Sequence, residues 1–97
     1  MSYDVTSAEY LGEYKIRLTF ENGKTGVVDF LPHTRRSGLF AKLKDMEYFK
    51  RFAVNQDLGT LTWGDELDVA PETLYSKATG EPLPQWMEQE VTLTDTA

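Results

Sequence analysis

The sequence contains no cysteine and a single histidine, His33. Without cysteine the chain forms no disulfide bond and offers no thiolate to a metal, and one imidazole excludes a site built from several histidine ligands. The chain also lacks an apolar run approaching the roughly 20 residues that span a bilayer, and its start has no basic segment followed by an apolar stretch. From these absences we expect a soluble, cytoplasmic protein without a membrane partner.

Basic residues are nearly absent from the second half of the chain. Residues 1–51 contain nine Lys and Arg and seven Asp and Glu, a net charge of +2, whereas residues 52–97 contain one and nine, a net charge of −8. The total of −6 argues against a protein that binds nucleic acid over its whole surface. The basic side chains of the first half still leave room for a local patch that faces a partner.

The length and composition indicate one folded domain. Of the 97 residues, 40% are hydrophobic and 27% are charged, which is ordinary for a globular protein. Pro82 and Pro84 mark a change in composition before an acidic end. We therefore expect a single α+β domain over residues 1–80 and a C-terminal acidic tail over residues 81–97 that is partly mobile.

Residues 14–30 predict a β-hairpin around which the domain is organised. Apolar and polar residues alternate from Tyr14 to Glu21, the pattern of a half-buried strand. Asn22 and Gly23 both tolerate the positive φ of a two-residue turn. That turn pairs Glu21 with Lys24, Phe20 with Thr25, Leu18 with Val27 and Ile16 with Asp29. One face is then apolar, and the other face carries Lys15, Arg17, Lys24, Val28 and Phe30.

Hydrophobic period and turn signals predict the remaining elements. Residues 5–11 are rich in strand formers and predict an edge strand beside the hairpin, whereas Pro and Gly in residues 31–38 predict an exposed loop. Helical spacing predicts a helix from Asp45 to about Phe52, after a looser turn at residues 39–43. A shorter hairpin at residues 53–63 and a helix at residues 71–77, ending near Gly80, complete a small antiparallel sheet with two short helices packed on it.

Six basic residues of the first half form a candidate nucleic-acid-binding face: Arg35, Arg36, Lys42, Lys44, Lys50 and Arg51. Such side chains neutralise a phosphate backbone when they converge on one surface. Asp45 and Glu47 interrupt the run, and a run of charges is usually a solvated face. Arg35 and Arg36 are therefore also candidates for contact with an acidic protein surface.

Little in the sequence suggests catalysis. His33 lies in the predicted loop, where it would be the one imidazole available for acid-base work, and no Ser or Cys nucleophile occurs in a recognisable catalytic motif. Four acidic residues could present carboxylates to Ca²⁺ or Mg²⁺, but their spacing does not match a calcium-binding loop: Asp65, Glu66, Asp68 and Glu72. An enzyme or metal-dependent hydrolase is the weakest hypothesis, and we expect no catalytic residue, no cofactor and no metal.

Large aromatic residues are the remaining candidates for partner binding. Trp63 and Tyr75 lie within predicted elements, so we expect them in the core. Trp86 and Met87 follow two prolines in the acidic tail, and they are candidates for docking on a neighbouring protein or on a second copy of the chain.

Several motifs resemble an uncharacterised bacterial family, the domain of unknown function DUF2442, over about residues 4–75. The similar pieces are Val5, Tyr-x-Ile-x-Leu-x-Phe-Glu-Asn-Gly at residues 14–23, Val28-Asp29 with Pro32, Gly38-Leu-Phe-Ala-Lys-Leu-Lys-Asp, Gly59 before Thr62-Trp63, and Asp68-Val-Ala-Pro-Glu-Thr-Leu-Tyr. The resemblance implies an α+β fold. It also implies proteins that are sometimes fused to a helix-turn-helix domain, and that are often encoded beside a small partner in an arrangement like that of a toxin and antitoxin pair.

From the residues and this resemblance, we expect a non-enzymatic protein-interaction domain, antitoxin-like or regulatory, that binds a small neighbouring protein. Exposed edge strands and the Trp86 segment would make its contacts, by strand addition or by an aromatic anchor. The alternative is a nucleic-acid-binding module that uses the basic face of residues 35–51.

Overall fold

The computed structural model describes residues 3–64 and 66–82 of the chain. The first sheet contains β1 (Val5–Gly12), β2 (Lys15–Phe20) and β3 (Thr25–Asp29), and the second contains β4 (Ala53–Asn55), β5 (Thr60–Trp63) and β6 (Leu67–Asp68), each in that order and antiparallel. The helices are α1 (Leu31–Thr34), the 3₁₀ helix η1 (Gly38–Lys44), α2 (Met46–Phe49) and α3 (Pro71–Thr79). The small α+β fold expected from the sequence is confirmed.

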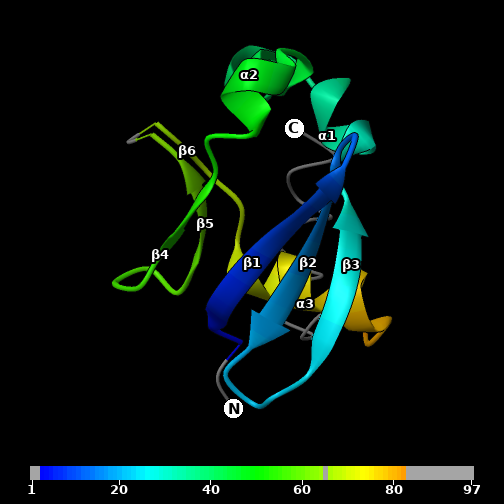
Figure 1. Cartoon of the computed structure of the whole chain (residues 1–97), viewed down its shortest axis with the longest axis vertical. Coiled ribbons are helices and arrows are strands. Elements are labelled where there is room, and N and C mark those ends of the chain that lie inside the picture. Colours follow the sequence, from blue (N-terminus) through cyan, green and yellow to red (C-terminus); the bar gives the residue numbers. More distant parts are fainter. Residues whose placement is uncertain (1–2, 65, 83–97) are drawn as a thin grey trace, which may run out of the picture.

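The first sheet is the centre of this arrangement (Figure 1). Helix α3 lies behind it, α1 and α2 gather at one end, and the second sheet stands to one side, with β3 on the side facing away from it. The main-chain N–H of Val5 donates to the carbonyl of Gly59 at 2.9 Å, which ties the start of β1 to the loop between β4 and β5. Strand β3 is therefore the outer strand of the first sheet.

The hairpin of β2 and β3 forms, but its predicted register is wrong by one residue. Arg17, not Leu18, lies opposite Val27, and Leu18 lies opposite Gly26. The N–H of Phe20 donates to the carbonyl of Lys24 at 2.9 Å, so the loop consists of Glu21, Asn22 and Gly23. Gly23 supplies the left-handed residue, at φ 87°, that a three-residue hairpin loop requires.

This shift exchanges the two faces of β3, because successive side chains of a strand point to opposite sides. Val28 and Phe30, which were expected on the polar face, are 1% and 0% exposed and pack with Ile16 and Leu18 in the core. Val27, which was expected on the apolar face, is 44% exposed.

The start of α2 and both ends of α3 follow the signals in the sequence, whereas α2 ends at Phe49, three residues before the predicted end at about Phe52. The side chain of Asp45 accepts a hydrogen bond from the N–H of Glu47 at 3.0 Å and caps α2. Pro71 occupies the first turn of α3, and Gly80 closes that helix in the left-handed conformation, at φ 80°. Another expectation fails here, because residues 31–34 of the predicted loop form the helical turn α1.

The core joins both sheets to the helices. The indole of Trp63 stacks on Phe49, and its Nε1–H donates to the carbonyl of Phe49 at 2.8 Å. Tyr75 of α3 meets Phe20 edge to face, with ring centroids 5.0 Å apart. Trp63 and Tyr75 are 0% and 2% exposed, which confirms that both belong to the core.

Candidate interaction surface

The outer side of β3 presents main-chain groups without a partner. Hydrogen-bonded and non-hydrogen-bonded pairs alternate along antiparallel strands. The N–H of Phe20 donates to Lys24 and the N–H of Phe30 donates to Tyr14, so the residues between them that bond to β2 are Gly26 and Val28. Thr25, Val27 and Asp29 therefore direct their N–H and C=O groups away from β2. Within residues 3–64 and 66–82, no hydrogen bond reaches these groups. We call the outward main chain of these three residues the β3 edge.

The side chains of the β3 edge leave it accessible. Thr25, Val27 and Asp29 are all exposed, and the carboxylate of Asp29 accepts a hydrogen bond from the N–H of Leu31 at 2.9 Å. Natural sheets protect open edges with Lys, Pro, bulges or a covering segment. Strand β3 has no Lys and no Pro, and its pairing with β2 runs without a bulge, so the strand is suited to pair with another strand.

Helix α3 supports β3 from the core side. Gly26 lies directly against α3, because a Cβ at this position would fall 2.0 Å from the carbonyl oxygen of Ala78. No larger residue fits between the strand and the helix. The close approach fixes the position of β3 on α3.

Three of the six basic candidates contact side chains of different elements. The guanidinium of Arg36 lies over the ring of Phe40 at 4.9 Å, and Nζ of Lys50 lies over the ring of Tyr10 at 5.5 Å. Lys42 bonds to Glu66 at 2.5 Å beyond β5. These three cations thus point to different elements, while Arg35, Lys44 and Arg51 are exposed around α1, η1 and α2.

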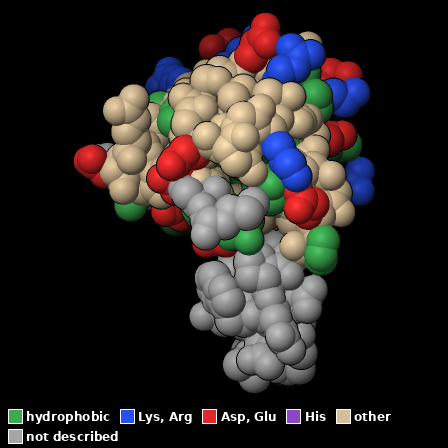
Figure 2. Space-filling model, turned by 90° about the horizontal axis from the view of Figure 1, so that it is seen from below, with side chains coloured by type: hydrophobic (Ala, Val, Ile, Leu, Met, Phe, Trp, Pro, Cys, Tyr) green, Lys and Arg blue, Asp and Glu red, His purple; other side chains and the backbone are tan. Residues whose placement is uncertain are grey.

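The pair of Lys42 and Glu66 compensates one of these charges. The hydrogen bond between them raises the pKa of Lys42 and lowers the pKa of Glu66, and the hydroxyl of Tyr48 also donates to Glu66 at 3.2 Å. Figure 2 shows Lys and Arg side chains interspersed with Asp and Glu over the coloured part of the face seen from below. This face lies at the end of the molecule opposite α1 and α2, and charges of both signs are mixed on it.

His33 is not the exposed loop residue that the sequence suggested. It lies in α1 with 4% of its surface exposed, between the rings of Phe30 and Phe40 at centroid distances of 5.3 and 5.7 Å. Burial lowers the pKa of its imidazole from 6.5 to about 4, and the positive charges of Lys77 and Arg36 add to the effect. Among the described residues, its buried Nδ1 has no hydrogen-bond partner. A neutral, buried imidazole is poorly placed for acid-base chemistry on a substrate.

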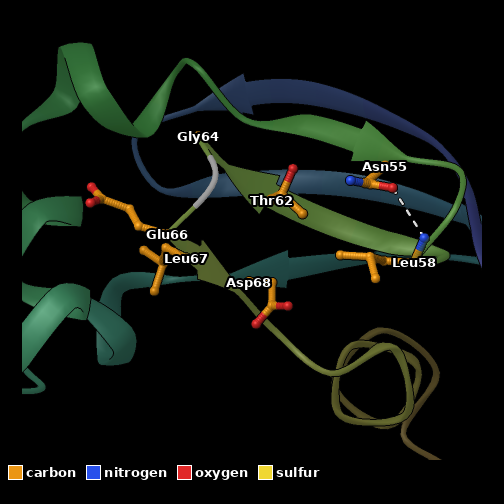
Figure 3. A pocket seen from close by; sticks show the side chains of 7 residues that line it. All are labelled: Asn55, Leu58, Thr62, Gly64, Glu66, Leu67 and Asp68. Carbon is orange, nitrogen blue, oxygen red and sulfur yellow. Dashed lines mark hydrogen bonds between the residues drawn. The ribbon is translucent and has the colours of Figure 1, made fainter.

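A shallow pocket of about 230 Å³ lies over β5 and β6 (Figure 3). Thr62, Asn55 and Asp68 line it, and the Asn55 side chain accepts a hydrogen bond from the N–H of Leu58. The carboxylates of Glu66 and Asp68 point in different directions (Figure 3). Among the described residues no three His, Asp or Glu side chains come together as metal ligands, and Asp65 lies outside the described residues.

A second hollow, of about 370 Å³, adjoins the end of β3. Tyr14, Leu31 and Met46 form its apolar part, and its charged rim consists of Glu13, Lys15 and Asp29. Leu31 is 40% exposed. An apolar side chain of a segment bound along the β3 edge would lie next to this hollow at the end of the strand.

Glu81, close to the end of the described residues, lies next to the start of β3. The carboxylate of Glu81 accepts hydrogen bonds from Lys24 at 2.5 Å and from the Tyr75 hydroxyl at 2.8 Å. The bond to Lys24 lowers the pKa of Glu81 and raises that of Lys24. Trp86 and Met87, the tail candidates for partner binding, lie outside the described residues.

Sequence reasoning missed Val27 and Lys77 as candidate surface residues. Val27 was assigned to the buried face because a two-residue turn was assumed. The alternation in β3 itself favours the observed face, because Val28 and Phe30 are larger and more apolar than Thr25 and Asp29 and are better suited to the core. Lys77 is the one cation of residues 52–97, and only its position on α3 brings it close to α1.

The fold and this surface define a small α+β domain with an open sheet edge. A family model described as "Protein of unknown function (DUF2442)" matches residues 5–80, and the chain belongs to this family. Comparison with curated proteins gives no match, and comparison with solved structures gives none. Within the part of the chain that the structure describes, no helix has the length and apolar character needed to cross a membrane.

Proposed function

We propose that this chain is a non-enzymatic protein-interaction domain, an antitoxin-like or regulatory partner of a small protein encoded beside it. The observation that supports the proposal is the open β3 edge. Three outward residues of a strand that packs on α3 offer six main-chain hydrogen-bonding groups, the arrangement that strand addition uses. The burial of His33 points the same way, since it removes the one imidazole from the surface.

Co-expression with the product of the adjacent gene tests this proposal. We expect the two chains to co-elute in size-exclusion chromatography with light scattering, and we expect this chain to restore the growth of cells that a toxic neighbour inhibits. The variant Val27→Pro removes the central donor of the β3 edge and should weaken the complex. Val27→Thr keeps that donor and is the matched control. Absence of both a complex and any effect on growth would refute the proposal.

A nucleic-acid-binding module is the second candidate. It is favoured by the exposure of Arg35, Lys44 and Arg51 at the end of the molecule that α1 and α2 form. Binding of this kind falls steeply with salt. If DNA or RNA binds with such a salt dependence, and the variant Arg35→Ala/Arg36→Ala loses it, this second function replaces the first.

A further inference from the structure

We propose that the β3 edge binds an acidic segment of the partner as an added antiparallel strand, with alternate carboxylates beside Arg36 and Lys77. The proposal rests on the interaction function above and specifies the chemistry of the segment that is recognised. Its basis is the combination of an open edge with two cations on adjoining segments that form no ion pair among the described residues.

The main chain of the edge sets the length and direction of the segment. Thr25, Val27 and Asp29 are spaced two residues apart, so each can form a hydrogen-bonded pair with every second residue of an antiparallel strand. Such a strand would lie about 4.8 Å from β3. About five residues in extended conformation therefore satisfy the edge.

Both cations belong to segments that adjoin β3. Lys77 directly precedes Ala78, whose carbonyl lies against Gly26 of β3 on the core side. Arg36 follows α1, the helical turn that begins two residues after β3 ends. Both side chains are exposed. Within residues 3–64 and 66–82, neither forms an ion pair with a carboxylate. A strand on the β3 edge turns every second side chain toward the core side, where a carboxylate would meet a positive charge.

The solvent-facing side of the added strand would be matched by a different type of side chain. Val27 is 44% exposed, and the neighbouring Arg17 is already bonded to Glu9 at 2.8 Å. A β-branched or other apolar residue of the added strand would cover Val27. Alternation of acidic and apolar residues is therefore the pattern that fits both sides of the edge.

A second copy of this chain fits the edge less well. Two chains paired through β3 would bring a second Arg36 and a second Lys77 to the same border, where like charges repel. Each copy would also carry its own α3, whose C-terminal end lies past β3 on the open side (Figure 1). A single strand can lie over this helix end, whereas a second globular domain would have to accommodate it.

Amide hydrogen exchange and a peptide titration on the full chain test the proposal. The probe is a short fluorescent peptide in which Glu and Val alternate, and the matched control peptide has Lys in place of Glu. In the free protein we expect fast exchange at the Val27 amide and slow exchange at the Val28 amide, which is bonded within the sheet. The acidic peptide should bind and protect Val27, whereas the basic peptide should not bind.

Variants identify the groups responsible. We expect Arg36→Glu/Lys77→Glu to weaken binding of the acidic peptide at least about tenfold, and Val27→Pro to have a similar effect. Lys50→Glu/Arg51→Glu changes the net charge equally at a distance from the edge and should stay within about twofold of the unmodified chain. Slow exchange at Val28 in each variant shows that the fold is intact.

Other occupants would produce distinct results, each of which overturns the proposal. Slow exchange at Val27 in the isolated monomer means that the chain itself covers the edge, and a dimer lost in Val27→Pro means that a second copy does. If the natural partner co-elutes and still binds both variants, the inference fails while the interaction function stands. If neither the peptide nor a partner binds, both fail.

Discussion

Acidification should destabilise this protein through His33 before most of its carboxylates are protonated. The imidazole has a pKa of about 4 in the folded chain, against an ordinary value of 6.5. Between these values the unfolded chain binds more protons than the folded chain, so the free energy of unfolding rises with pH across this window. The contribution is constant above about pH 6.5 and is lost as the pH falls toward about 4.

The magnitude follows from the two pKa values. Each unit of pKa difference corresponds to about 1.4 kcal/mol, so His33 accounts for a loss of about 3 kcal/mol over the window. That is a large part of the 5–15 kcal/mol by which most domains are stable, as an order of magnitude. Burial is the main cause, and the cations Lys77 and Arg36 oppose protonation further.

Urea denaturation of the unmodified chain and of His33→Phe, from about pH 7 to about pH 4, measures this effect. Phe keeps a ring between Phe30 and Phe40 and has no proton to gain, so carboxylates contribute equally to both proteins. The difference in unfolding free energy should change by about 3 kcal/mol across the series. A constant difference, or an imidazole that titrates near 6.5 by NMR, would refute the reasoning.

Three substitutions test the packing of the fold. Gly26→Ala should destabilise the protein by at least about 2 kcal/mol in thermal unfolding, since its methyl group meets the carbonyl of Ala78; an unchanged Tm would contradict the close approach. Trp63→Phe should cost about 2–3 kcal/mol in urea, because it removes buried volume and one of the two hydrogen bonds that the carbonyl of Phe49 accepts. Asp45→Ala should cost about 1 kcal/mol and Asp45→Asn clearly less, as measured in urea, and equal losses would argue against the cap.

The local elements were predictable because their signals lie within a few residues. Asp45 caps α2 as expected, and Gly80 closes α3 in the left-handed conformation that glycine adopts without strain. The identity of the buried aromatics was equally accessible, since Trp63 and Tyr75 occur at the inward positions of predicted elements.

The hairpin shows where local signals fail. Asn22 and Gly23 suit a two-residue turn, yet a three-residue loop forms with Gly23 as its left-handed residue. Both loops are compatible with the turn residues. The free energy of burying Val28 and Phe30 favours the observed register, and that burial depends on Phe49, Trp63 and α3, which are distant in the sequence.

The α+β class, the positions of most strands and helices, and membership of a family with this pattern were predictable from residues close together in the sequence. The buried face of β3, the enclosure of His33 and the packing of α3 against Gly26 depend on contacts between residues that are distant in the sequence. The two groups of features differ in the sequence separation of the residues that interact. Capping and alternation act over a few residues, whereas burial and charge act between side chains that only the folded chain brings together.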